Sequence, residues 1–101
     1  MKLTRKNIIT ILRREHPFLK NHFGVKRLAF FGSFANGRPN KNSDVDIFVE
    51  FSRPVGLRFI QMTEYLEKKL GRRIDVLTPG GIKGIRLRKV AQNIQRSMIY
   101  V

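Results

Sequence analysis

Two aspartates, Asp44 and Asp46, stand one residue apart in the apolar segment SDVDIFVEF. Side chains alternate between the two faces of a β-strand, so both carboxylates emerge on one face if this segment is a strand. Aspartate is depleted in strands and neighbouring like charges repel, so the arrangement needs compensation. Mg²⁺ supplies it, because this cation binds carboxylate oxygens together with the phosphate oxygens of a substrate.

A third carboxylate and a glycine turn belong to the same pattern. Asp75 lies between Ile74 and Val76 and is the one acid among the chain's seven that is placed to join the first two from a neighbouring strand. Two metal ions about 3.5 to 4 Å apart hold the attacking and leaving oxygens of a phosphoryl displacement. Upstream, Gly32-Ser33 ends an apolar run and presents backbone amides and a hydroxyl to an anion.

A structural interpretation of the aspartates remains open beside the chemical one. An aspartate at the first residue of a strand often caps a turn. Asp46 has three candidate ion-pair partners, which are Arg27, Arg38 and Arg73. The presence of Gly32-Ser33, Gly37 and Ser43 next to the acidic pair favours the chemical interpretation, because these residues suit the binding of phosphate.

The elements that must position these residues follow from hydrophobic spacing and from Gly and Pro. Helical spacing predicts a helix capped by Thr4 that ends before Pro17 or near Lys20, and helices over 57–70 and from 82 to about 96. Strands are predicted over 25–31, 44–51 and 73–77. Residues 33–36 suit a single helical turn, and residues 37–43, 53–56 and 78–81 are predicted loops and turns. This order predicts one α/β or α+β domain over residues 1–101.

The composition narrows the class of protein. A chain of 101 residues with 42% hydrophobic residues suits one packed core rather than a disordered tail. The absence of cysteine excludes disulfides, thiolate metal sites and a cysteine nucleophile. The N-terminal segment alternates charge and aliphatic residues, unlike a signal peptide, and no apolar run is long enough to span a bilayer. A cytoplasmic location is therefore expected.

The net charge of +14 favours an anionic partner. Nucleic acid, the phosphates of a nucleotide, an acidic protein surface and anionic lipid all fit this charge. The basic residues are spread along the chain rather than gathered in one block, so a generally solvated basic surface fits equally well. Charge alone does not select a function.

The spacing of the motif resembles that of a known superfamily. Gly32-Ser33, Gly37 after three residues, and then Ser43-Asp44-x-Asp46 resemble the signature of the DNA polymerase beta-like nucleotidyltransferases. The small size, the SFANG turn, the segment VGLRFIQMTEYLEKKLGRRIDVLTP and the basic tail are similar to the minimal nucleotidyltransferases, or MNT family. The similarity extends from about Val25 to the C-terminus.

This resemblance implies a fold and a reaction. The fold is a short mixed sheet flanked by helices, like the polymerase beta palm. The reaction transfers AMP from ATP, with two Mg²⁺ ions, to an acceptor hydroxyl. Asp44, Asp46 and Asp75 are then the metal ligands and catalytic residues, and Gly32 and Ser33 hold the triphosphate with Ser43 nearby. Asn36 departs from the family, whose members often carry Arg there, and Arg38 is the candidate replacement.

The resemblance also implies a partner. Minimal members resemble the antitoxin half of a two-gene module, similar to type VII systems, whose other half is a HEPN-domain ribonuclease toxin. The acceptor is then expected to be a tyrosine hydroxyl of that toxin. The alternative is a non-catalytic antitoxin, or a nucleic-acid-binding module, that acts by contact through its basic surface. No membrane partner is expected.

Overall fold

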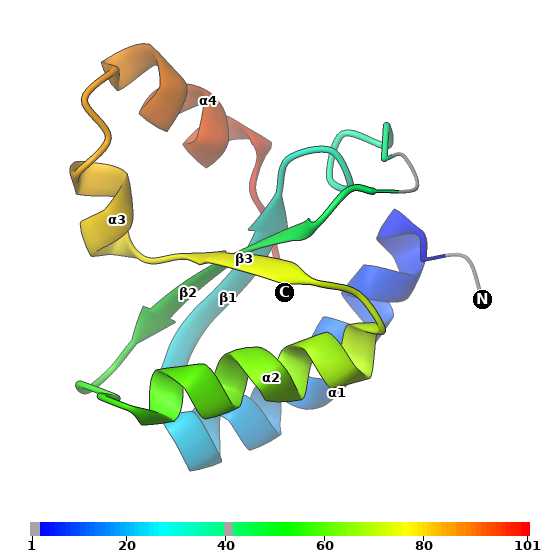
Figure 1. Cartoon of the computed structure of the whole chain (residues 1–101), viewed down its shortest axis with the longest axis vertical. Coiled ribbons are helices and arrows are strands. Elements are labelled where there is room, and N and C mark those ends of the chain that lie inside the picture. The colour runs from blue at the N-terminus through cyan, green and yellow to red at the C-terminus, as the bar shows by residue number, and fades with distance from the viewer. Residues whose placement is uncertain (1–2, 40–41) are drawn as a thin grey trace.

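A computed structural model of the chain describes residues 3–39 and 42–101 (Figure 1). Its elements are α1 (Arg5–Phe23), β1 (Val25–Phe31), β2 (Val45–Phe51), α2 (Arg58–Leu70), β3 (Ile74–Leu77), α3 (Pro79–Lys83), α4 (Arg88–Ser97) and β4 (Ile99–Tyr100). The strands form one sheet in the order β3-β2-β1-β4. β1 is antiparallel to β2 and β4, whereas β2 and β3 are parallel. The predicted mixed sheet flanked by helices is confirmed.

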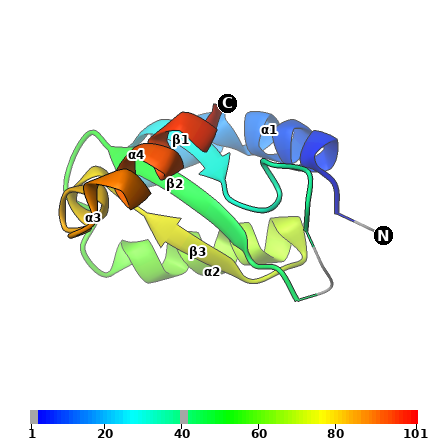
Figure 2. The same ribbon diagram turned by 90° about the horizontal axis from the view of Figure 1, so that it is seen from above.

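One face of the sheet carries the main core. α1 and α2 lie side by side against this face (Figures 1 and 2). The inward residues of β2, which include Val45, Ile47 and Val49, are fully buried there together with Ile8 and Leu12 of α1. Because strand side chains alternate, Asp46 is directed to the opposite face, as the sequence pattern predicts.

The opposite face is only partly covered. Ala29, Phe31, Phe48 and Ile82 form a second, smaller buried cluster, against which partly buried residues of α4 pack. α3 and α4 lie over one side of this face, and the loop between β1 and β2 rises on the other side (Figure 1). The middle of the face, where Asp46 lies, is left accessible between them.

The first helix is longer than predicted. It passes through Pro17 and ends at Phe23, where Gly24 adopts a left-handed conformation with φ of 75° and donates its N–H to the carbonyls of Leu19 and Lys20. Proline removes one helical hydrogen bond. Leu19 and Phe23 lie beyond Pro17 and are buried, so their burial offsets the loss and the helix continues to the glycine.

The C-terminal prediction is wrong in two places, and the structure adds a strand where the sequence predicts no element. Residues 79–83 form α3 rather than a loop, because the Thr78 side chain caps the helix by accepting the N–H of Gly81 at 3.2 Å. The predicted helix from residue 82 breaks at Gly84 and resumes as α4 at Arg88. The last residues form β4, which pairs with Ala29 and Phe30 of β1. Because this pairing joins segments that lie far apart in the sequence, no local pattern of residues indicates it.

No helix in the described ranges combines the length and apolarity required to cross a membrane.

A buried carboxylate joins the two core helices and gives a stability prediction. Glu15 of α1 is 7% exposed and accepts hydrogen bonds from the Tyr65 hydroxyl and from Arg14 Nε. The Tyr65 hydrogen bond is the main reason that the pKa of Glu15 lies below its ordinary value. Tyr65→Phe is expected to lower the free energy of unfolding by about 1 to 3 kcal/mol at neutral pH, as measured by urea denaturation.

The pH dependence checks the cause of that loss. A lowered folded-state pKa stabilises the protein above the ordinary carboxyl pKa, and this contribution disappears as pH falls through the lowered value. The difference between wild type and Tyr65→Phe should therefore shrink on acidification. The phenyl ring of the variant keeps the stacking on Phe18, whose ring centroid lies 4.8 Å from that of Tyr65. The two proteins therefore differ in the hydrogen bond and not in the packing of this ring. Equal unfolding free energies at neutral pH would contradict the prediction.

Candidate active site

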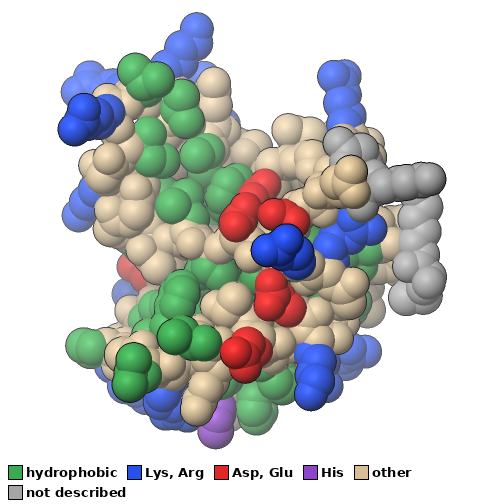
Figure 3. Space-filling model, viewed as in Figure 1, with side chains coloured by type: hydrophobic (Ala, Val, Ile, Leu, Met, Phe, Trp, Pro, Cys, Tyr) green, Lys and Arg blue, Asp and Glu red, His purple; other side chains and the backbone are tan. Residues whose placement is uncertain are grey.

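The sheet register brings two of the predicted carboxylates together. Asp46 of β2 and Asp75 of β3 are direct partners in the parallel pairing. Asp44 stands one residue before β2. Burial raises the pKa of Asp46 above its ordinary value, and the charges of Asp75 and then Asp44 add to the rise. The three aspartates therefore lie close enough to repel one another, and Figure 3 shows acidic side chains gathered in the middle of this face.

Gly32 lies in contact with the central carboxylate. Its φ of 75° is a left-handed conformation, and a Cβ added at this position would lie 2.1 Å from Asp46 Oδ2. A real Cβ cannot approach an oxygen so closely. The position therefore requires glycine for two separate reasons, the backbone conformation and the carboxylate against it. The Gly-Ser motif and the aspartate motif meet here.

The segment after Gly32 forms the predicted compact turn. Asn36 N–H donates to the Gly32 carbonyl at 3.0 Å, and Arg38 N–H donates to the Ser33 carbonyl at 2.9 Å. From outside the turn, Arg5 Nη1 donates to the Ala35 carbonyl at 3.1 Å. These bonds hold the backbone beside Asp46 in a set position.

Arg72 is a residue that the sequence analysis missed. Its Nη1 donates to the Ser43 carbonyl at 3.1 Å, and its guanidinium lies 5.3 Å from the centroid of the Phe34 ring. Arg72 thus joins the start of β3, the Gly-Ser turn and the segment that leads into β2. A signal exists in the sequence, because Arg72 and Arg73 stand between the helix-ending Gly71 and the strand that carries Asp75.

A cavity of about 270 Å³ opens beside Asp44. Its walls are formed by Asn42, Ser43, Asp44, Arg72 and Arg73. Guanidinium groups recognise phosphate oxygens through several hydrogen bonds at once. The predicted Ser43 therefore lies at a place whose charge suits a phosphate group, and two arginines accompany it.

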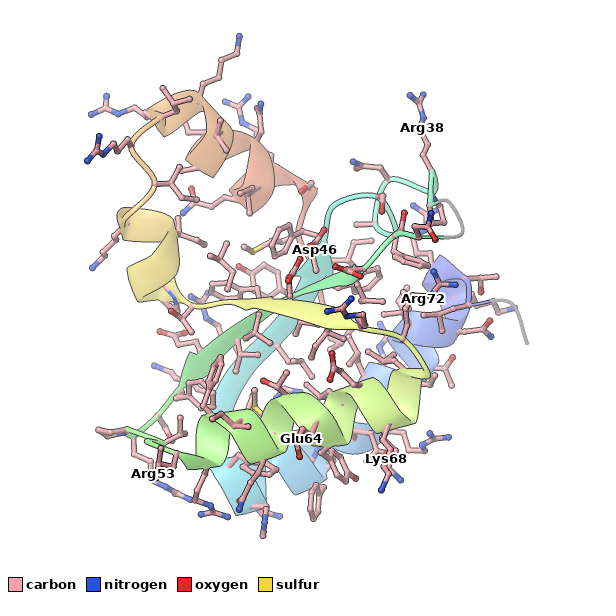
Figure 4. All side chains as sticks on the ribbon, viewed as in Figure 1. Arg38, Asp46, Arg53, Glu64, Lys68 and Arg72 are labelled. Atoms are coloured by element: carbon pink, nitrogen blue, oxygen red, sulfur yellow. The ribbon has the colours of Figure 1, made fainter. Side chains whose placement is uncertain are left out.

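Arg38 is positioned differently from the other predicted residues. It is exposed on the loop between β1 and β2, and its side chain projects outward, away from Asp46 (Figure 4). In the same view, Arg72 lies near the start of β3, nearer to Asp46. The predicted contact of Arg38 with the triphosphate requires this side chain to turn inward.

The ion pairs do not support a purely structural role for Asp46. Arg27, one of its candidate partners, binds Glu50 instead. Within residues 3–39 and 42–101, the other ion pair joins Arg14 and Glu15. Asp46 is therefore partly buried near two other carboxylates without a cation against it in the described part of the chain.

The chemistry of the donors suits Mg²⁺, which prefers oxygen ligands. A bound cation would offset the burial and the carboxylate repulsion that together raise the pKa of Asp46. No three His, Cys, Asp or Glu side chains in the described ranges already converge as a metal-binding cluster. The types and charges of the three aspartates suit Mg²⁺. Their side chains lie on the same part of the face but do not converge on one point as metal ligands would.

Comparison with known proteins points to one family. The sequence profile described as the nucleotidyltransferase domain matches residues 5–101. The chain is 37% identical over 100 residues to the protein adenylyltransferase MntA of Thermococcus cleftensis, covering 98% of this chain and 97% of that protein. It is 39% identical over 101 residues to an inferred protein adenylyltransferase of Methanocaldococcus jannaschii, covering 97% of this chain and 98% of that protein.

Solved structures share the fold. An inferred minimal nucleotidyltransferase superposes with a TM-score of 0.68 at 27% identity, covering 95% of this chain and 94% of that chain. A toxin–antitoxin crystal structure with AMP-PNP superposes with a TM-score of 0.62 at 20% identity, covering 97% of this chain and 72% of that chain. The second likeness concerns the fold alone.

Proposed function

The chain belongs to the nucleotidyltransferase domain family and is a minimal nucleotidyltransferase, and we propose that it transfers AMP from ATP to a hydroxyl group of a partner protein. One observation supports this reaction above the others. The Asp46 carboxylate lies against the Gly32 backbone, and Asp46 is the direct partner of Asp75 on the neighbouring strand. A triphosphate held at Gly32-Ser33 would therefore lie beside the carboxylates.

Each group has a task in the proposed transfer. Gly32, Ser33 and Ser43 bind the triphosphate, and the guanidinium groups of Arg72 and Arg73 neutralise its charge. Asp44 and Asp46 would hold the cation that allows the anionic α-phosphate to lie beside them, and Asp75 faces the incoming hydroxyl and accepts its proton. Mg²⁺, when bound by the three aspartates, would supply neutralisation of the phosphates and activation of the acceptor oxygen. Positioning and electrostatics account for catalysis of this kind.

The partner that we propose is a HEPN-domain toxin, with a tyrosine as the acceptor. The support is the name of the Thermococcus cleftensis relative, a protein adenylyltransferase, and the fold shared with the toxin–antitoxin structure that contains AMP-PNP. The chain would then act as an antitoxin by modifying its toxin. ATP is abundant in the cytoplasm, so the proposal includes a cytoplasmic location.

Incubation with ATP labelled in the α-phosphate, Mg²⁺ and the proposed HEPN-domain partner tests the proposal. We expect label on the partner, release of one pyrophosphate per label, and loss of both when EDTA is added. Mass spectrometry should place the AMP on a tyrosine. Full neutralisation of the toxin without label would contradict catalysis and favour an antitoxin that acts by contact.

A further inference from the structure

The side from which the acceptor arrives follows from the reaction geometry of the proposed function, on which this inference rests. In phosphoryl transfer the attacking and leaving oxygens lie roughly in line on opposite sides of the phosphorus. The leaving pyrophosphate belongs at Gly32-Ser33 and the cavity beside Ser43. The acceptor hydroxyl must therefore approach from the opposite side of Asp46, which is the side of α3 and α4 (Figure 1).

An exposed apolar surface lies on that side. None of the residues of α4 is buried, and Leu87 and Val90 are 67% and 42% exposed. One turn further along, Ala91 and Ile94 pack against the second buried cluster. In Figure 3 hydrophobic side chains form a band that runs from the region of α4 toward the central acidic residues. Leu87 and Val90 are called the α4 patch below.

The charges around the α4 patch have one sign. Residues 76–101 contain no acidic residue. Their basic side chains are exposed and comprise Lys83, Arg86, Arg88, Lys89 and Arg96. A surface that complements this region presents apolar side chains surrounded by carboxylates.

We propose that the α4 patch is the docking surface for the acceptor protein, and that the matching surface of the acceptor is apolar with an acidic rim. An RNA partner fits the patch less well. Single-stranded RNA binds through basic grooves combined with aromatic side chains on which bases stack, and residues 84–97 contain no aromatic residue. Tyr100, beyond α4, is 48% exposed, but the Arg27 guanidinium already lies over its ring, 5.6 Å from the centroid. The exposed Leu87 and Val90 instead resemble the apolar centre of a protein interface.

The chain provides a matched control for the test. Leu57 and Ile60 of the α2 region have the same spacing as Leu87 and Val90, and they are 86% and 58% exposed. Leu57 also stands at the residue before its helix, as Leu87 does. Leu57→Ser with Ile60→Ser therefore removes a similar exposed apolar pair from the opposite layer of the molecule.

Steady-state transfer of AMP to the proposed HEPN-domain acceptor should distinguish the two apolar pairs. Leu87→Ser with Val90→Ser is expected to raise the KM for the acceptor at least about tenfold, with the kcat at saturating acceptor and the Kd for ATP unchanged. The control pair should leave all three constants unchanged. Unaltered acceptor KM in the α4 variant, an equal rise in the control, or weakened ATP binding would each overturn the proposal.

A charge-reversal variant gives a second test of docking in which α4 is expected to stay folded. Arg88→Glu with Lys89→Glu places acidic residues in the first turn of α4, where they favour the helix, so its circular dichroism should be retained. The acceptor KM should rise at least about tenfold, and the effect should weaken as salt increases. If the change instead affects only RNA binding, measured by filter retention of labelled RNA, docking of an acidic protein is refuted.

Direct binding distinguishes failure of docking from failure of the proposed chemistry. Calorimetric titration with the acceptor needs no transfer of label. If wild type transfers no AMP but binds the acceptor in a manner that depends on Leu87 and Val90, the docking surface is supported and the enzymatic proposal fails. If wild type transfers AMP and both apolar pairs prove neutral, the enzymatic proposal is supported and the docking surface is refuted.

Discussion

Asp46→Asn is expected to reduce AMP transfer roughly 10²- to 10³-fold, because it removes the central one of the three carboxylates that would hold Mg²⁺ and with it the charge compensation for the reacting phosphate. Asparagine keeps the size of the side chain and its place against Gly32. The loss should therefore appear in kcat. Acceptor binding, measured by calorimetry, should be unchanged. The measurement is transfer of label from ATP at saturating acceptor.

The same substitution should not destabilise the protein. The pKa of Asp46 is raised by burial and by the charges of Asp75 and Asp44, so the ionised carboxylate opposes folding above its ordinary pKa. Asp46→Asn removes this repulsion, and its melting temperature in EDTA should equal or exceed that of wild type. Glu50→Gln is the control, since it neutralises another acid of β2 on the same face. Its transfer rate should stay near that of wild type, and an equal loss in both variants would contradict a specific role for Asp46.

Gly32→Ala is expected to abolish most transfer and to destabilise the fold. The alanine Cβ would meet Asp46 Oδ2 at 2.1 Å, and the backbone would have to keep a φ of 75°. A non-glycine residue in such a conformation costs about 1 to 3 kcal/mol. The carboxylate must also move, so we expect a loss of roughly 10²-fold or more in kcat, measured by the same label transfer.

Gly37→Ala separates these two costs. Gly37 has a φ of 73°, but nothing lies within 4 Å of the Cβ that the substitution adds. Gly37→Ala should lose only the unfolding free energy that the backbone strain costs, and Gly32→Ala should lose at least that amount in urea. Only Gly32→Ala should also displace Asp46 and lose most of its activity. If Gly37→Ala proves as inactive as Gly32→Ala, backbone strain in the turn and not the carboxylate contact explains the loss.

The residue types and local periods of the sequence are enough to predict much of the site. Alternation along β2 places Asp46 on the face opposite Val45 and Ile47, because side-chain direction in a strand depends only on position. The spacing of the apolar residues predicts the main strands and helices, because side-chain direction repeats with a fixed period in each kind of element. The end of the first helix shows the limit of such patterns, since the sequence predicts an end before Pro17 or near Lys20, whereas the burial of Leu19 and Phe23 extends the helix to Phe23.

The tertiary structure decided which of these residues meet. The parallel register of β2 and β3 places Asp75 opposite Asp46, and the fold brings Gly32 into contact with that carboxylate. Arg72 lies in the site, the side chain of Arg38 points away from it, and β4 extends the sheet by pairing with β1. Local patterns could not show these outcomes, because contacts between distant segments depend on how whole elements pack. The type of a residue and the periodicity of its neighbours predict the direction of its side chain, whereas packing determines which residues that side chain contacts.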